Sequence, residues 1–327
     1  MRTIAIVAGG YSSEHDVSLR SADGLMSFMD KEKYRCIVVD LERETWTALY
    51  GDERCSIDKN DFSFTASDGR HTFDFAYITI HGTPGEDGVL QGYFDMIGMP
   101  YSTSDVLVES LTFNKFALNN FLRAFPDIHI AKSLLLRKGD ALPAADEVVA
   151  EMGLPCFVKP NAGGSSFGVT KVKTADALIP AIERAMNESD EVMVEQLMVG
   201  TEITCGAYKK GDDVITFPIT EVVTTQEFFD YDAKYNGKVD EITPARIPAA
   251  VADRVSALTR RIYRLLGCFG IIRIDYILSG DPAEPQINLL EINTTPGMTA
   301  TSFIPQQVRA AGLNIGNVLS DIIEAKF

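Results

Sequence analysis

Residues 287–299 read INLLEINTTPGMT, an apolar run that predicts a buried strand yet carries Glu291 and Asn293. Side chains alternate between the two faces of a strand, so Glu291 and Asn293 project from the same face. A carboxylate on a buried strand is costly unless a cation or hydrogen-bond donors satisfy it. The stretch therefore predicts a core strand that also carries a polar site.

A second strand upstream has the same character. Residues 270–278, GIIRIDYIL, place Arg273 and Asp275 on one face of an apolar run. The intervening residues 279–286, SGDPAEPQ, are dense in turn formers. The two runs therefore predict an antiparallel hairpin with a charged face.

The register of this hairpin decides which charges meet. Closure near Ala283 places Asp275 opposite Glu291, and the same register places Arg273 opposite Asn293. Two carboxylates directly opposite each other destabilise a sheet. A hard divalent cation such as Mg²⁺ would reverse that effect, because it binds carboxylate and amide oxygens together with substrate phosphates. Arg273 could equally neutralise both acids in a structural ion-pair cluster, and the hairpin alone leaves both interpretations open.

Length and composition limit the class of protein. The chain has 327 residues, 46% of them hydrophobic, which predicts a globular protein of two or three domains or lobes. Its net charge of -16 argues against nucleic acid or an anionic membrane as a partner. The five cysteines form no CxxC pair and the four histidines show no metal-ligand spacing, which favours reduced thiols and argues against zinc. We expect a cytoplasmic protein without a signal peptide or a membrane span.

Residues 1–103 predict an N-terminal α/β domain with a parallel sheet. Three apolar runs are typical of buried strands: residues 2–10, 36–41 and 75–80. A helix follows the first run, with Ser12 or Ser13 as the expected N-cap. No GxGxxG follows the first strand, so a nicotinamide-binding site is not indicated.

The rest of the chain predicts two further lobes. Residues 104–190 begin with one helical stretch, 106–125, and continue into an α+β central lobe. Residues 191–327 are rich in antiparallel strand patterns and contain the acidic hairpin. We therefore expect an α/β protein with an N-terminal domain followed by two lobes.

A glycine-rich segment predicts contact with phosphate. Residues 159–169, KPNAGGSSFGV, follow a strand, and their glycines let backbone amides approach an anion. Lys159 ends the apolar strand, where an ammonium avoids burial unless an anion awaits it. Lys115, within TFNKFAL, could be a second phosphate ligand or a surface residue of a helix.

Three further segments have a structural and a functional interpretation. Residues 224–238, TTQEFFDYDAKYNGK, predict either a solvated loop or a lid in which Lys234 reaches a phosphate and Tyr235 closes the site. Glu14 could complement a helix dipole, worth about 0.3–1 kcal/mol, or hold a substrate ammonium. His81 follows a strand in a glycine-rich turn, HGTPGEDG, where it could be structural or face a ligand.

Six segments together resemble the D-alanine:D-alanine ligase family of the ATP-grasp superfamily. In chain order they are AGGYSSEHDVS, HGTPGEDGVLQGYFDMIGMPY, VKPNAGGSSFGV, FFDYDAKY, RIDY and LLEINTTPGMT. Their order and their spread over nearly the whole chain make the resemblance specific. It implies that residues 104–190 and 191–327 are the two lobes of an ATP-grasp fold, with ATP between them.

The family resemblance implies a reaction. A first D-alanine carboxylate attacks the γ-phosphate of ATP, and the amine of a second D-alanine displaces phosphate from the resulting acyl phosphate. The products are D-alanyl-D-alanine for peptidoglycan synthesis, ADP and phosphate. Related ligases use D-lactate or D-serine as the second substrate, and a non-catalytic nucleotide-binding regulator is an alternative of another class.

The resemblance also implies residue roles around ATP. Asp275, Glu291 and Asn293 would surround two Mg²⁺ ions, for which Mn²⁺ could substitute, and Lys115 and Lys159 would contact phosphates. The nucleotide would further contact these positions: Ser165, Glu195, Met198, Glu202 and Lys234. Position 196 is Gln where some relatives have Lys, so the resemblance does not fix the polar contacts on that edge of the adenine.

The implied substrate contacts complete the site. Glu14 would bind the ammonium of the first D-alanine. Ser165 and Tyr235 would form a hydrogen-bonded set with Glu14 that locks the lid. Arg273 and the Gly297 amide would form an oxyanion site. His81 would lie beside the first substrate, and Ser302 with Lys234 would bind the second carboxylate. The expected partners are D-alanine and ATP, with a homodimer as one expected assembly.

Overall fold

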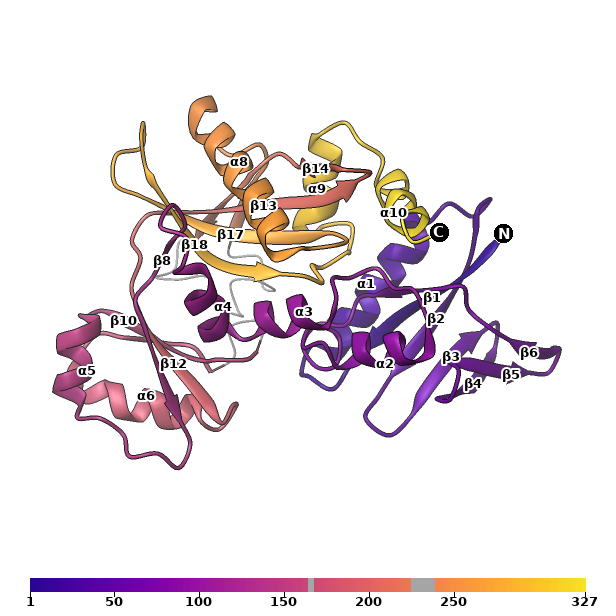
Figure 1. Cartoon of the computed structure of the whole chain (residues 1–327), viewed down its shortest axis with the longest axis horizontal. Coiled ribbons are helices and arrows are strands. Elements are labelled where there is room, and N and C mark those ends of the chain that lie inside the picture. Colours follow the sequence, from indigo (N-terminus) through magenta and orange to yellow (C-terminus); the bar gives the residue numbers. More distant parts are fainter. Residues whose placement is uncertain (164–167, 225–238) are drawn as a thin grey trace.

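The computed structural model describes residues 1–163, 168–224 and 239–327 (Figure 1). Within these ranges the chain forms three β-sheets, each covered by helices. None of the described helices combines the length and the apolar character that crossing a membrane requires. Ser165, Lys234 and Tyr235 lie outside the described residues.

The first sheet has the strand order β6-β5-β4-β3-β2-β1-β7. Its strands are β1 (Arg2–Gly9), β2 (Tyr34–Leu41), β3 (Trp46–Tyr50), β4 (Glu53–Asp58), β5 (Ser63–Ala66), β6 (Gly69–His71) and β7 (Phe75–Ile78). The three strands expected from the sequence, β1, β2 and β7, pair in parallel, whereas β3 to β6 extend the sheet as an antiparallel meander. The parallel α/β core is therefore present with an antiparallel extension.

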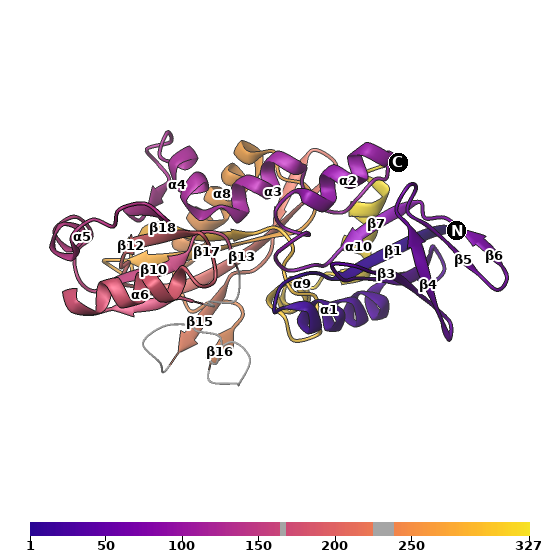
Figure 2. The ribbon, with the colours of Figure 1, turned by 90° about the horizontal axis from the view of Figure 1, so that it is seen from below.

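Helices α1 (His15–Phe28) and α2 (Val89–Ile97) lie on opposite faces of the first sheet (Figure 2). The alternation of side chains along β1 explains this arrangement. Ile4 and Ile6 pack in one hydrophobic cluster with Leu25 of α1, and Val7 packs in another with Phe94 of α2. Helix α10 (Ile315–Glu324) joins the α1 side, so the end of the chain completes the core of the first sheet (Figure 1).

The second sheet has the strand order β11-β10-β12-β9 and is antiparallel. Its elements are β9 (Ser133–Arg137), α5 (Ala145–Met152), β10 (Cys156–Pro160), β11 (Thr170–Val172), the 3-10 turn η1 (Ala175–Ala177), α6 (Leu178–Ala185) and β12 (Glu191–Gln196). The buried face of α6 packs with Val158 of β10 in one hydrophobic cluster. This sheet therefore combines strands from the range 104–190 with β12, which lies beyond residue 190.

The third sheet has the strand order β16-β15-β13-β17-β18-β8, with β14 paired to β13. Its strands are β8 (His129–Ile130), β13 (Thr201–Lys210), β14 (Asp213–Thr216), β15 (Thr220–Thr224), β16 (Val239–Ile242), β17 (Ile272–Ser279) and β18 (Gln286–Asn293). Helix α8 (Ala249–Leu266) packs on it through Val255 and Ile262, and α9 (Phe303–Ala310) follows β18. The β17–β18 hairpin, which carries Asp275 and Glu291, thus lies inside this sheet.

The register predicted for the hairpin is confirmed where the charges lie. Asp275 pairs with Glu291, and Arg273 pairs with Asn293. A β-bulge shifts the register between Asp275 and Tyr276, so Tyr276 lies opposite Leu289. The sequence did not predict this bulge, which bends the strand beside the acidic residues.

The helical stretch 106–125 is not continuous. It forms α3 (Val106–Phe113) and α4 (Lys115–Leu122), because Asn114 leaves the helical conformation and its Oδ1 accepts a hydrogen bond from the Ala117 amide at 2.9 Å. Asn161 Nδ2 donates to the same Oδ1 at 3.0 Å. The break places Lys115 at the start of a new helix, where the sequence expected a helix interior.

The expected N-cap of α1 is also different. Glu14, not Ser12 or Ser13, is the residue before the first helical turn. The Glu14 amide donates a hydrogen bond to Ser12 Oγ at 3.2 Å, so the serine shapes the turn that precedes the helix. As a result, the Glu14 side chain is buried at the helix start.

Gly24 lets α1 approach the segment that follows β18. A Cβ atom at Gly24 would lie 2.1 Å from the carbonyl oxygen of Met298, a distance that real Cβ contacts do not reach. We therefore expect Gly24→Ala to lower the free energy of unfolding by about 1–3 kcal/mol, as measured by urea denaturation.

Gly92 in α2 supplies the matched control. A Cβ atom there would meet Val106 Cγ2 at 3.7 Å, an ordinary contact. Gly92→Ala should therefore raise stability by about 0.5–1 kcal/mol through the lower entropy of the unfolded chain. Equal effects of the two substitutions would contradict the close packing of α1 against residue 298.

Candidate active site

A cavity of about 630 Å³ lies where the first and third sheets and α4 meet. Its wall includes eight of the residues that the sequence singled out: Glu14, His81, Lys115, Arg273, Glu291, Asn293, Gly297 and Ser302. They come from the start of α1, the loop after β7, the start of α4, the β17–β18 hairpin and the segment after it. The fold thus brings together positions as far apart in the sequence as Glu14 and Ser302.

Arg273 and Asp275 form the charged centre of the hairpin. Arg273 Nε donates to Asp275 Oδ1 and Arg273 Nη2 donates to Oδ2, both at 2.9 Å. Asn293 Nδ2 donates to the same Oδ2 at 3.2 Å. Burial alone would lower the pKa of Arg273, but the attraction of Asp275 outweighs it, and the pKa is raised. The guanidinium therefore keeps its positive charge beside the cavity.

The donor set of the hairpin also suits a hard cation. A carboxylate offers about four lone-pair sites, so a bidentate contact with arginine leaves acceptor capacity on Asp275. Glu291 and Asn293 line the cavity next to it and supply carboxylate and amide oxygens, the ligands that Mg²⁺ prefers. The ion pair expected from the structural interpretation is present, and the residues fit a magnesium site as well.

Lys115 and Gly163 bring the glycine-rich segment to the cavity. Lys115 is the first residue of α4, and its Nζ donates to the Gly163 carbonyl at 2.7 Å. Both residues line the cavity. The ammonium lies beside the segment that the sequence associates with phosphate.

Lys159 forms an ion pair with Glu195. Its Nζ lies 2.6 Å from Glu195 Oε2, and both side chains are buried on the neighbouring strands β10 and β12. Asn119, which lines the cavity, lies 3.5 Å from Glu195 Oε1 through its Nδ2. Met198 follows β12, and Glu202 lies in β13. Through Asn119, Lys159 and Glu195 therefore adjoin the cavity from the second sheet, whereas Glu202 belongs to the third sheet.

The segment after β18 forms a tight turn. The Thr299 amide donates to Ser302 Oγ at 3.1 Å, and a Cβ atom at Gly297 would lie 3.0 Å from the same oxygen. The Met298 amide donates to Ser21 Oγ of α1 at 3.3 Å. Both Gly297 and Ser302 are thereby held in the cavity wall.

Glu86 is a cavity residue that the sequence reasoning missed. The Gly82 amide donates to its Oε2 at 2.7 Å, and burial, with a smaller contribution from Glu14, raises its pKa to about 7. Its position in HGTPGEDG, an acid within a glycine-rich turn after a strand, was the available signal. Glu14 and Glu86 together place two carboxyl groups in this part of the cavity wall.

Glu109 is a second acid that the sequence reasoning missed, and it contacts the residue that follows β18. It is fully buried on α3 and accepts hydrogen bonds from the Ser104 amide at 3.0 Å and from Thr294 Oγ1 at 2.5 Å. Burial raises its pKa well above the ordinary value. Because Thr294 directly follows Asn293, Glu109 helps to position the end of β18.

The raised pKa of Glu86 predicts a dependence of stability on pH. Between its ordinary pKa of 4.5 and the folded value of about 7, the folded protein binds more protons than the unfolded chain. The free energy of unfolding contributed by this group therefore decreases as pH rises through that window. Glu86→Gln should remove the decrease and raise the free energy of unfolding at about pH 8 by about 2 kcal/mol.

Urea denaturation at about pH 5 and about pH 8 measures this effect. Glu44→Gln removes a carboxylate from an exposed position and should behave like the parent protein. The same pH dependence in the parent and in Glu86→Gln would contradict a strained carboxylate in the cavity wall.

Comparison with known proteins identifies relatives over the full length of the chain. Residues 3–104 match the family described as "D-ala D-ala ligase N-terminus", and residues 126–324 match "D-ala D-ala ligase C-terminus". The D-alanine--D-alanine ligase of Phocaeicola vulgatus is 62% identical over 327 residues, which cover 100% of this chain and 99% of the relative. That of Bacteroides fragilis is 60% identical with the same coverage.

Solved structures agree in fold. D-alanyl-alanine synthetase A from Vibrio cholerae superposes with a TM-score of 0.87 at 28% identity, covering 99% of this chain and 98% of the other. VanG D-Ala:D-Ser ligase from Enterococcus faecalis gives 0.86 at 30% identity with the same coverage. D-alanine--D-alanine ligase from Bacillus anthracis complexed with ATP gives 0.77 at 30% identity, covering 99% and 97%. The chain therefore belongs to the D-alanine–D-alanine ligase family and has the ATP-grasp architecture of that family.

Proposed function

We propose that the chain joins two D-alanine molecules at the expense of ATP and releases D-alanyl-D-alanine, ADP and phosphate, for the synthesis of peptidoglycan precursors. One observation carries the proposal. A single cavity is lined by a buried acid, Glu14, and by a charged arginine, Arg273, in a chain whose relatives at about 60% identity are D-alanine--D-alanine ligases. An amino acid carries both of the opposite charges that these residues would bind.

The first step brings a carboxylate against a polyphosphate, so positive charge is required. Arg273 and Lys115 supply it within the cavity wall. Asp275, Glu291 and Asn293 would hold Mg²⁺, which when bound neutralises the charge of the ATP phosphates. Lys159, linked to Glu195, would contact phosphate from the second sheet, and Glu195, Met198 and Glu202 would contact the nucleoside of ATP.

Binding of the first substrate would use the acidic part of the cavity. Glu14 would accept hydrogen bonds from the D-alanine ammonium, and Glu86, whose pKa is already raised by burial, would gain stability as an anion when that ammonium enters. His81 is buried in the cavity wall beside them. This arrangement would select an α-amino acid for the first position.

The second step would take place near the turn after β18. The Gly297 amide and the Arg273 guanidinium would stabilise the oxyanion that forms when the second amine attacks the acyl phosphate. Ser302 would bind the second carboxylate, together with Lys234 from outside the described residues. Ser165 and Tyr235, which also lie outside the described residues, would form the hydrogen-bonded set with Glu14 that locks the lid.

The identity of the second substrate is the finer part of the proposal. Two D-alanine--D-alanine ligases are about 60% identical to this chain over its full length. The D-Ala:D-Ser ligase of known structure is 30% identical, no more than the D-alanine--D-alanine ligase from Bacillus anthracis. D-alanine is therefore the second substrate that we propose. We also expect action in the cytoplasm and assembly into a homodimer, which sedimentation velocity would test.

Phosphate release from ATP and Mg²⁺ tests the proposed function. D-alanine should stimulate release and yield dipeptide, whereas L-alanine should not. D-serine or D-lactate, added with limiting D-alanine, should give less mixed product than D-alanine gives dipeptide. No stimulation by D-alanine would contradict the proposal, and a preference for D-serine or D-lactate would assign the chain to the related ligases. ATP binding without turnover would indicate a regulator.

A further inference from the structure

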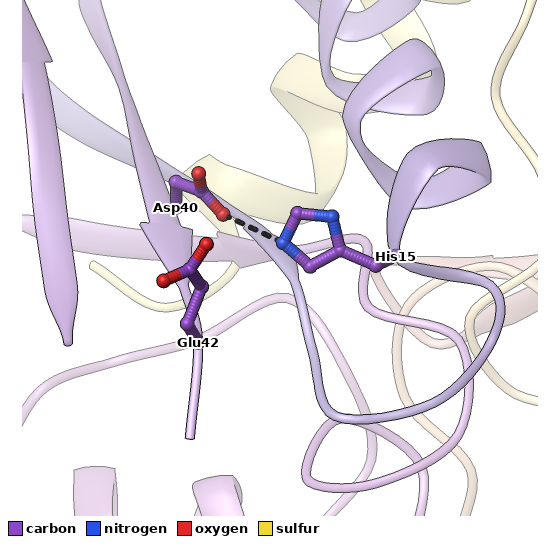
Figure 3. Close-up of side chains that lie close together, drawn as sticks. All are labelled: His15, Asp40 and Glu42. Carbon is purple, nitrogen blue, oxygen red and sulfur yellow. Dashed lines mark hydrogen bonds and ion pairs between the residues drawn. The ribbon is translucent and has the colours of Figure 1, made fainter. Parts of the chain in front are cut away.

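We propose that His15, Asp40 and Glu42 form a binding site for a divalent transition-metal ion, with Zn²⁺ as the best-matched cation. The three side chains converge at the carboxyl ends of β1 and β2, as Figure 3 shows. One ligand atom from each lies within 4.8 Å of the other two. The site is separate from the oxygen-donor set of the β17–β18 hairpin, because its residues belong to the first sheet and α1.

The distances between donors fit a small cation. Zinc binds imidazole nitrogen and carboxylate oxygen at about 2.0–2.2 Å, so two ligand atoms in a tetrahedral site lie about 3.3 Å apart. His15 Nε2 and Asp40 Oδ1 are 3.1 Å apart. Glu42 is exposed and can move by a side-chain rotation to complete the set, whereas Asp40 is buried and fixed by the sheet.

The second nitrogen of His15 faces a carboxylate. Asp16 Oδ1 lies 3.5 Å from His15 Nδ1, on the opposite side of the ring from Asp40. Asp40 Oδ1 lies closer to the other ring nitrogen, 3.1 Å from Nε2. A metal ion that replaced a proton on Nε2 would leave Nδ1–H facing Asp16, the arrangement in which a carboxylate orients a metal-binding histidine. With the proton on Nδ1, the lone pairs of Nε2 and Asp40 Oδ1 would face each other, which a cation between them would relieve.

The backbone leaves room for a cation beside Asp40 Oδ1 and His15 Nε2. Arg54 lies 3.8 Å from Asp40 Oδ2, the oxygen that does not face His15, so Oδ1 keeps its lone pairs for the metal. Gly9 has a φ of +89°, and a Cβ atom there would lie 2.6 Å from Asp40 Oδ1 and 3.0 Å from His15 Nε2. Any other residue at position 9 would thus fill the space beside the donor pair.

The mixed donor set decides the class of cation. One imidazole and two carboxylates suit Zn²⁺ better than Mg²⁺, which prefers oxygen ligands only. The sequence argued against zinc because its histidines are not at ligand spacing, but the fold joins His15 to Asp40 of β2 and to Glu42 just after that strand. Since His15 directly follows Glu14, a bound ion would also hold the first turn of α1.

Zinc binding to the metal-stripped, full-length protein tests the proposal. Equilibrium dialysis against Zn²⁺ in excess Mg²⁺, performed in the parent and in a Glu291→Gln background, separates this site from the hairpin. We expect one Zn²⁺ per chain that is retained in Glu291→Gln. His15→Ala and Glu42→Gln should each weaken its binding by at least about tenfold. Glu42 is exposed, so its substitution leaves the fold intact.

A second histidine–carboxylate pair provides the matched control. His71 Nε2 lies 2.7 Å from Asp68 Oδ1 in the same sheet. Among the described residues, no third histidine, cysteine or carboxylate lies close enough to this pair to complete a metal site. His71→Ala should therefore bind Zn²⁺ like the parent. Equal zinc affinity of the parent and Glu42→Gln, or no zinc bound by the Glu291→Gln protein, would overturn the proposal and leave an ordinary hydrogen bond between His15 and Asp40.

Discussion

Replacing Arg273 with alanine is expected to lower both the stability and the turnover of the protein. Arg273 makes two hydrogen bonds to Asp275, and both side chains are largely buried. Removing one partner of a buried ion pair leaves an uncompensated charge, which costs about 3–5 kcal/mol in the free energy of unfolding. Loss of the charge that we propose stabilises the oxyanion should lower kcat by about 100- to 1,000-fold.

Two comparisons separate these effects. Arg261→Ala removes an exposed ion pair with Asp127 at 2.8 Å and should cost less than about 1 kcal/mol. Arg273→Lys keeps the charge but loses the bidentate geometry, so it should recover stability more than turnover. Urea denaturation and steady-state kinetics measure the two quantities. An Arg273→Ala protein as stable as the parent would contradict the buried pair, and one with full turnover would exclude Arg273 from catalysis.

Glu291→Gln is expected to remove most of the turnover while leaving stability without metal equal or higher. Glu291 lies opposite Asp275 in the hairpin and lines the cavity. Loss of a carboxylate from the expected magnesium site should lower kcat on the order of 100-fold or more. In the absence of metal, the substitution instead relieves repulsion between two neighbouring carboxylates.

Glu284→Gln in the turn of the same hairpin is the control, because Glu284 is exposed and should affect neither quantity. Denaturation in the presence of a chelator measures stability, and ADP release measures turnover. A marked loss of metal-free stability in Glu291→Gln would support the interpretation in which the hairpin is only a structural ion-pair cluster.

The features that the sequence predicted best are those set by short-range periodicity. The pairing of Asp275 with Glu291 required only the alternation along two strands and the position of the turn between them. The bulge next to Asp275 was not predictable, because it shifts the register by one residue without a glycine or proline to mark it. The family and the ATP-grasp architecture, inferred from six motifs together, are confirmed.

Features set by tertiary contacts were harder to predict. Asn114 ends α3 because its side chain caps the next helix and contacts Asn161, a residue of a distant segment. Lys159 was expected to meet an anion, but nothing in its neighbourhood of the sequence identifies Glu195 as the carboxylate beside it. Likewise, the raised pKa of Glu86 results from burial in a cavity that only the folded chain creates.

Transfer of oxygen from D-alanine to phosphate tests the proposed chemistry most directly. If the cavity activates a carboxylate as an acyl phosphate, the bond between the carbonyl carbon and one carboxylate oxygen breaks when the second amine attacks, and that oxygen leaves with the phosphate. D-alanine labelled with heavy oxygen in its carboxylate should therefore yield phosphate that carries one labelled oxygen, together with ADP and D-alanyl-D-alanine. Unlabelled phosphate, or AMP in place of ADP, would contradict the proposed mechanism.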